Sequence, residues 1–192
     1  MAADIFEKVV KNMGPIGSHA HYSHHYYSFP KLSGELGPYM YFNGKKMLNW
    51  SLNNYLGLAN HPEVREADAQ AAAEYGLAYP MGARMMTGNT DLHEEFEQQL
   101  AHFVGKEDAF LLNYGYQGFM SAIEALVDIH DVIVYDAESH ACLIDGIRLH
   151  RAKGGKTYTF KHNDMESLEK NLLRAAKVAE ESNGGILGIT ES

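Results

Sequence analysis

A regular alternation of short apolar segments with amphipathic helical patterns, from about residue 90 onward, constrains the fold of this chain most strongly. Four apolar runs have the length of buried strands: 109–112, 132–135, 157–160 and 186–190. Strands that alternate with helices indicate βαβ crossovers and parallel pairing. We therefore expect an α/β fold in which helices cover both faces of a mainly parallel sheet.

The first 50 residues are predicted to form an N-terminal arm and a small hairpin. Residues 2–12 have the apolar spacing of a short helix, which Gly14-Pro15 would end, and an extended arm or loop should follow to about residue 34. Asn43-Gly44 lies between two strand-like runs, and this dipeptide is the strongest short-range signal for a hairpin.

Residues 51–192 are expected to form the first part of a larger domain. Its first helix begins at Pro62, because the first turn of a helix tolerates proline, and it ends near Gly76. The sequence stops directly after the apolar run at 186–190. Domains rarely end in this way, so we expect the chain to be the front part of a longer protein.

Composition and charge exclude several classes of function. The formal net charge of −9 comes from scattered acids, so neither nucleic acid nor an anionic membrane is expected as a partner. The one cysteine, Cys142, excludes an internal disulfide and suits a reducing compartment. The N-terminus lacks a signal pattern, and no apolar run approaches the about 20 residues of a membrane span. These features predict a cytoplasmic protein with a small-molecule site.

The turn that follows residues 109–112 is the first candidate site. It reads Asn113-Tyr-Gly-Tyr-Gln-Gly118 and leads straight into a helix, whose free N–H groups and dipole favour an anion such as phosphate. Gly115 would let the backbone approach that anion closely. The turn matches neither the dinucleotide nor the phosphate-loop pattern, so an ordinary strand-to-helix turn is the more common explanation.

Ser139 and His140 form the second candidate, at the carboxyl end of the next strand. The flat imidazole of His140 could stack on an aromatic cofactor or take a proton, and Ser139 could cap the helix or reach a phosphate. A simple helix cap is an equally good explanation. Glu191 follows the last strand, where ligands bind in open α/β sheets.

Two further segments are weaker candidates. Asn53 lies in an ordered turn, and Arg84 lies in a constrained loop where it could bind a carboxylate or phosphate with two hydrogen bonds. Each is more often structural or solvated. The histidines at positions 19, 21, 24 and 25 match no standard metal spacing, so we predict no metal site.

In order along the chain, several motifs together resemble the α-oxoamine synthases. The motifs span Asn53–Pro62, Gly82–Arg84, Thr87–Glu97, Asn113–Tyr116 and Asp136–Ala141. The resemblance covers roughly residues 35–192. It implies the fold of pyridoxal-phosphate (PLP) dependent transferases such as aspartate aminotransferase, with residues 51–192 as the first part of the PLP-binding domain. It leaves residues 1–34 unexplained.

The same resemblance implies an activity and roles for individual residues. Members condense an amino acid with an acyl-CoA, with loss of CO₂ and CoA, to give an α-amino ketone, and they are homodimers. By resemblance, His140 stacks on the pyridine ring and the backbone at Gly115 and Tyr116 meets the phosphate. Asn53 and Glu191 then lie near the substrate end. We group His140 and Glu191 as predicted catalytic residues, Gly115, Tyr116, Ser139 and His140 as cofactor-binding, and Asn53 and Arg84 as substrate-binding.

Two departures from the family limit these expectations. Relatives continue with an aspartate for the pyridine nitrogen and a lysine that holds the cofactor covalently, and no lysine here lies in a comparable motif. We therefore expect this chain to be inactive by itself. Residues 79–84 also differ from a more glycine-rich run in many relatives, which leaves the substrate open. Alternatives are an aminotransferase or lyase of the same fold, or a non-catalytic partner of a lysine-bearing subunit.

Overall fold

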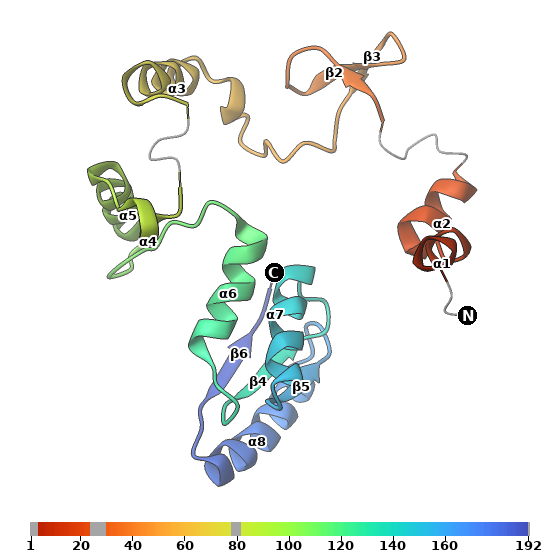
Figure 1. Ribbon diagram of the computed structural model, residues 1–192, viewed down its shortest axis with the longest axis vertical. Coiled ribbons are helices and arrows are strands. Elements are labelled where there is room, and N and C mark those ends of the chain that lie inside the picture. Colours follow the sequence, from red (N-terminus) through yellow and green to blue (C-terminus); the bar gives the residue numbers. More distant parts are fainter. Residues whose placement is uncertain (1–3, 24–29, 78–81, 192) are drawn as a thin grey trace. The chain divides into compact units, whose positions relative to one another are not determined.

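The computed structural model describes residues 4–23, 30–77 and 82–191, which form two compact units (Figure 1). The first unit comprises residues 1–88 and the second comprises residues 89–192. The predicted division into residues 1–50 and 51–192 concerns domains of the complete protein, and it stays a prediction.

The first unit contains short helices and a small antiparallel sheet. Its elements are α1 (Ile5–Lys11), α2 (Gly14–Tyr22), β1 (Leu32–Ser33), β2 (Tyr39–Phe42), β3 (Lys45–Leu48), a 3₁₀ turn (Leu58–Asn60), α3 (Pro62–Tyr75) and α4 (Arg84–Thr87). The helix over residues 2–12 is confirmed within the described residues, as is the helix from Pro62 to Gly76. The prediction of an extended arm was wrong for residues 14–22, which form α2. Pro15 lies in the first turn of this helix, where its missing N–H costs nothing. Residues 24–29 of that arm lie outside the described residues.

The predicted hairpin is confirmed. Asn43 and Gly44 have φ values of 50° and 74°, so both central residues of the turn are left-handed, as the tightest hairpin turns require. β2 and β3 pair antiparallel up to the Phe42–Lys45 pair. β1, which was not predicted, adds a third antiparallel strand beside β2.

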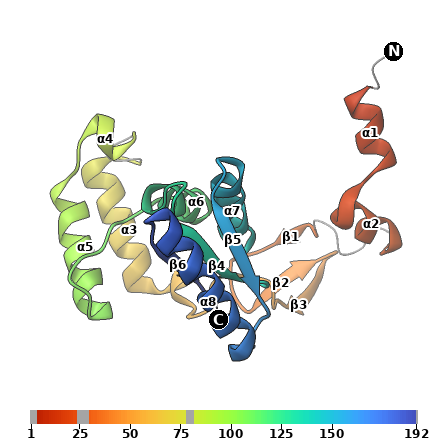
Figure 2. The same ribbon diagram turned by 90° about the horizontal axis from the view of Figure 1, so that it is seen from below.

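The second unit contains the parallel sheet. Its elements are α5 (Asp91–Val104), α6 (Gly115–Leu126), β4 (Val132–Asp136), α7 (Ala141–Ala152), β5 (Lys156–Phe160), α8 (Met165–Ser182) and β6 (Ile186–Ile189). The strand order is β5-β4-β6, and both pairings are parallel. The predicted α/β class with parallel pairing is therefore confirmed (Figures 1 and 2).

The core of this unit lies on both faces of β4. Val132 and Val134 pack with Phe160 and with the side of α8 that carries Ala175 and Ala179. The opposite face is formed by residues of β4, β6, α6 and α7, namely Ile133, Ile189, Ile123 and Ile147. Each fully buried Val or Ile contributes about 1.5–3 kcal/mol relative to an exposed one. The result is a layer of α6 and α7, the sheet, and a layer of α8.

The strand predicted at residues 109–112 was wrong. Phe110 is 70% exposed, Leu112 is 50% exposed, and this stretch pairs with no strand in the described part of the chain. The N–H of Leu111 instead donates to the carboxylate of Glu97 on α5, at 2.6 Å. A short apolar run does not become a strand without a neighbour to complete its backbone ladder.

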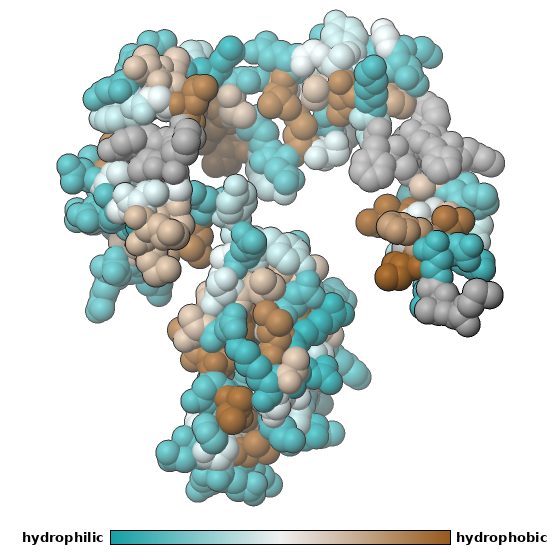
Figure 3. Space-filling view, in the orientation of Figure 1, coloured by the Kyte–Doolittle hydropathy of each residue, from teal (hydrophilic) through white to brown (hydrophobic). Residues whose placement is uncertain are grey.

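Large apolar side chains also lie on the surface of the second unit (Figure 3). Phe103, Phe119, Leu126 and Leu173 are each more than half exposed. Among the helices that the structure describes, none is long and apolar enough to cross a membrane.

Candidate functional site

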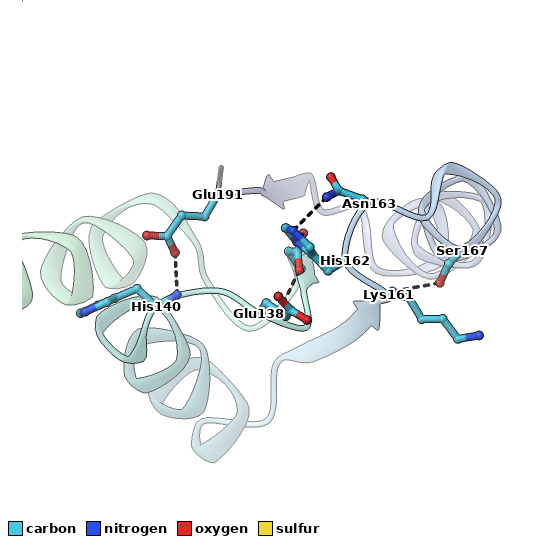
Figure 4. A network of polar contacts seen from close by, with 8 residues as sticks. Glu138, His140, Lys161, His162, Asn163, Ser167 and Glu191 are labelled. Atoms are coloured by element: carbon cyan, nitrogen blue, oxygen red, sulfur yellow. Dashed lines mark hydrogen bonds and ion pairs between the residues drawn. The ribbon is translucent and has the colours of Figure 1, made fainter.

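The carboxyl ends of the three parallel strands bring several predicted site residues together (Figure 4). β4 leads to Ser139 and His140, β5 leads to His162, and β6 leads to Glu191. Strands that run parallel end at the same edge of the sheet, and ligands of open α/β sheets bind there. This edge is the candidate site.

Glu191 bonds to the start of α7. Its Oε2 accepts a hydrogen bond from the backbone N–H of His140 at 2.5 Å, although the two residues are 51 positions apart. A carboxylate is favoured at a helix N-terminus, because the helix dipole and the unused N–H groups attract negative charge. The two residues predicted as catalytic are therefore neighbours in the structure.

The imidazole of His140 has a defined orientation. Its Nδ1 accepts a hydrogen bond from the backbone N–H of Cys142 at 3.2 Å, which caps α7, and the Sγ of Cys142 lies 3.0 Å from the same nitrogen. A ring nitrogen that accepts an N–H leaves the ring proton of neutral histidine on Nε2. His140 is exposed, so the ring is accessible from solvent.

Tyr116 joins α6 to this cluster. Its ring lies edge to face with that of His140, with the ring centroids 6.2 Å apart at 73°. Its hydroxyl donates to the carboxylate of Asp145 on α7. That bond raises the pKa of Tyr116, and together with a bond from Arg148 it lowers the pKa of Asp145. Sequence analysis found Tyr116 through its backbone position and missed Asp145.

The start of α6 has the features of an anion site. The first hydrogen bond of the helix runs from the N–H of Gly118 to the carbonyl oxygen of Tyr114, at 2.8 Å. The N–H groups of Gly115, Tyr116 and Gln117 are therefore not used within the helix. No side chain caps this end. At Gly118, in the first turn of α6, a Cβ would lie 2.7 Å from a Leu112 methyl, so a larger residue there would have to displace that side chain.

Ser139 provides independent evidence for a ligand. The residue is 9% exposed, and its buried Oγ has no hydrogen-bond partner among the described residues. A buried hydroxyl without a partner is costly, and such groups are usually satisfied by a ligand or an ordered water. An anion at this edge of the sheet would supply the missing acceptor.

A buried ion pair supports the loop that carries Ser139 and His140. Asp136 is 2% exposed, and its carboxylate accepts hydrogen bonds from the N–H of Glu138 and from Nδ1 of His162, both at 2.9 Å. The bond from Glu138, and then the one from His162, holds the pKa of Asp136 below its usual value although burial opposes this. Asp136 in turn raises the pKa of His162. The position of His162, two residues after β5, was a signal that sequence analysis did not use.

The two predicted substrate residues lie in the first unit. Asn53 accepts a hydrogen bond from the hydroxyl of Tyr55 at 3.2 Å, and Arg84 is the first residue of α4. Their substrate roles stay predictions, as do the catalytic and cofactor roles of the residues in the second unit. Among the described residues no group of His, Cys, Asp and Glu could hold a metal ion, and His24 and His25 lie outside them.

Comparison with known proteins identifies the family. The family model for aminotransferase class I and II matches residues 45–182. The chain belongs to the aminotransferase class I and II family. This family shares the PLP-dependent transferase fold, so the predicted fold is confirmed.

Two individual relatives show which members of this family the chain is similar to. A cysteate-C-fatty acyltransferase of Capnocytophaga ochracea is 64% identical over 188 residues, which cover 98% of this chain and 44% of that protein. An 8-amino-7-oxononanoate synthase of Thermoanaerobacter pseudethanolicus is 42% identical over 142 residues, which cover 73% of this chain and 35% of that protein. The resemblance to α-oxoamine synthases is therefore confirmed, and the chain spans less than half of these two relatives.

A solved structure shows the same fold. A serine palmitoyltransferase from S. paucimobilis with bound PLP has a TM-score of 0.76 and 23% identity, and the match covers 97% of this chain and 52% of that one. The residues of the candidate site fit PLP. The unused N–H groups of α6 and the Ser139 hydroxyl suit its phosphate, and the exposed ring of His140 suits its aromatic ring.

Proposed function

We propose that this chain is the N-terminal part of a PLP-dependent acyltransferase, which condenses a small amino acid with an acyl-CoA and releases CO₂ and CoA to form an α-amino ketone. One observation carries the proposal. The start of α6, the ring of His140 and the carboxylate of Glu191 are gathered at one edge of a parallel sheet. An aminotransferase or lyase of the same fold is the alternative.

The residues of this edge have distinct tasks in the proposed reaction. When bound, PLP supplies an electron sink for the substrate carbon that loses its carboxylate. The N–H groups at the start of α6 and the hydroxyl of Ser139 would hold its phosphate. The imidazole of His140 would cover its ring and present the Nε2 proton. Glu191, bonded to the N–H of His140, would place a negative charge beside the amino acid substrate.

We further propose cysteate as the amino acid and a fatty acyl group as its partner. The support is the 64% identity to a cysteate-C-fatty acyltransferase, over almost the whole of this chain. Cysteate carries a sulfonate, and a guanidinium recognises such planar or tetrahedral oxyanions with two hydrogen bonds. Arg84 is our candidate for this contact, with Asn53 beside the same substrate.

The chain by itself is proposed to be inactive. Lys161 is the nearest lysine in sequence to the strand ends, and its side chain extends away from His140 and Glu191 (Figure 4). The lysine that binds the cofactor would come from coding sequence beyond codon 192. We also propose that the complete enzyme is a homodimer, as the resemblance implies, and that it is cytoplasmic, as the sequence predicts.

The test begins with the DNA that follows codon 192, because an open reading frame in phase would define the complete enzyme. That enzyme should release CoA from a fatty acyl-CoA with cysteate, and more slowly with serine or glycine. Amino transfer to a 2-oxo acid without CoA release would support the aminotransferase alternative instead. Co-purification of the 192-residue chain with a separate lysine-bearing subunit would support a non-catalytic partner.

A further inference from the structure

Tyr116 is held by α7 at two points. Its hydroxyl donates to the carboxylate of Asp145, just over one turn into α7, and its ring meets the ring of His140, the residue that caps α7. The backbone of Tyr116 belongs to the first turn of α6. One side chain therefore connects the N-terminus of α6 to that of α7.

We propose that Asp145 is a positioning residue that acts through Tyr116, fixing the N–H groups at the start of α6 relative to the imidazole of His140. The proposal rests on the proposed function, in which these two helix starts hold the phosphate and the ring of one cofactor. Asp145 itself need not touch that cofactor. Its effect is to set the spacing between the two groups that do.

The surroundings of Asp145 suit this role. Oδ1 accepts a hydrogen bond from Arg148 at 2.8 Å, which leaves Oδ2 for the hydroxyl of Tyr116. A carboxylate is a stronger acceptor than a neutral group, and its bonds are shorter and more directional. The bond from Tyr116, and then the one from Arg148, lowers the pKa of Asp145, which favours the charged carboxylate.

His140 has little freedom to follow a displaced Tyr116. Its Nδ1 is bonded to the N–H of Cys142, and its backbone N–H is bonded to Glu191. The imidazole therefore stays with α7, whereas the phosphate-facing N–H groups move with α6. Loss of the Tyr116–Asp145 bond should change the distance between these two parts of the site.

The chain contains a matched control for this bond. Lys153, the residue that follows α7, and Glu124 of α6 form an ion pair with Nζ and Oε1 2.5 Å apart. This pair joins the same two helices at their opposite ends, away from His140. It separates a general effect of helix pairing from an effect on the site.

The experiment uses the complete enzyme loaded with PLP and compares Tyr116→Phe, Asp145→Ala and Glu124→Ala. The two site variants should each weaken PLP binding about tenfold, the scale of one charge-assisted hydrogen bond. Both should also alter the visible circular dichroism of bound PLP, which reports the asymmetry around its ring. The double variant should be no weaker than either single variant, and Glu124→Ala should match the unaltered enzyme in both measurements.

The possible results separate the proposal from the function on which it rests. Equal losses in Glu124→Ala and Asp145→Ala would show that helix pairing in general matters, which overturns the positioning role. An unchanged dichroism spectrum in Tyr116→Phe and Asp145→Ala would overturn it as well. If the unaltered enzyme binds no PLP, the proposed function fails first and the positioning role fails with it.

Discussion

The two ends of the parallel sheet differ in how their polar groups are hydrogen-bonded. At the amino end, the carboxylate of Asp131 accepts the N–H groups of Gly185 and Asp128 at 2.6 and 2.7 Å, and Ser182 donates to the carbonyl of His130 at 2.7 Å. At the carboxyl end, Ser139 keeps a buried hydroxyl without a partner among the described residues. The polar groups at the amino end bond to one another and join its loops, whereas the carboxyl end has an unpartnered hydroxyl close in sequence to the exposed His140.

The amino end has an unpartnered atom of its own, and the contrast is informative. Nε2 of His150 is buried without a hydrogen bond among the described residues, but it is packed against Gly155, where a Cβ would lie 2.1 Å from it. His150 lies in the last turn of α7, whereas His140, which caps the opposite end of the same helix, is exposed. Both unpartnered atoms are buried, so the difference between the two ends lies in the exposed His140 beside Ser139.

The largest expected effect comes from the carboxyl end. Replacing His140 with alanine in the complete enzyme should lower the rate of CoA release by about 10²-fold or more, because the ring that covers the cofactor and its proton are lost. The matched variant His130→Ala alters a histidine at the amino end and should leave that rate unchanged. Comparable activity of the two variants would contradict the division between the ends.

The second effect concerns the amino end and stability. A Cβ at Gly184 would lie 2.0 Å from the carbonyl oxygen of His130, so Gly184→Ala must displace backbone. We expect a loss of about 1–3 kcal/mol in the free energy of unfolding, measured in urea, with the rate per folded enzyme unchanged. Gly188→Ala is the control, since a Cβ there meets nothing within 4 Å.

A third effect is the pH dependence of the pair at the carboxyl end. Asp136 raises the pKa of His162, so the pair's contribution is complete below about pH 6.5 and is lost as the pH rises through the folded pKa. The pKa of Asp136 is lowered, so on the acid side the contribution is complete above about pH 3.9 and is lost as the pH falls through its folded value. The midpoint of thermal unfolding should therefore fall more steeply than in His162→Gln as the pH rises above about 6.5. Parallel curves would contradict this assignment.

The smallest expected effect concerns the exposed flanks of the sheet. Neither β5 nor β6 has a second neighbour among the described strands, and apolar side chains of this unit are exposed, among them Ile186 of β6 and Leu173 of α8. We expect the 192-residue chain to self-associate in solution, because open edges and apolar patches promote pairing between molecules. A single monomeric species in sedimentation over a range of concentrations would argue against this.

Local patterns predicted most of the elements because their signals lie within a few residues. Asn43-Gly44 specified its turn, and the apolar spacing after Thr90 and Asp164 specified two helices, which the side chains of those residues cap. The run at 109–112 was mispredicted because a strand depends on a partner that the run itself does not encode.

The candidate site was predicted in part, because some of its residues lie close in sequence to the ends of the strands. His140, Ser139 and Glu191 follow apolar runs directly, so the rule that ligands bind at strand ends found them. Asp145 and His162 were missed because their importance comes from side chains on other elements, Tyr116 and Asp136. Pairings of this kind depend on tertiary packing, which spacing along one chain does not reveal.

The bond between His140 and Glu191 also has a consequence for the order of assembly. Its two residues are 51 positions apart, and α7, β5, α8 and β6 lie between them or at their ends. During synthesis His140 is made before Glu191. The hydrogen bond between them can form only after the β5–α8–β6 segment has been synthesised and has docked. This part of the candidate site is therefore completed late, and unfinished chains would bind the cofactor poorly even when most of their helices have formed.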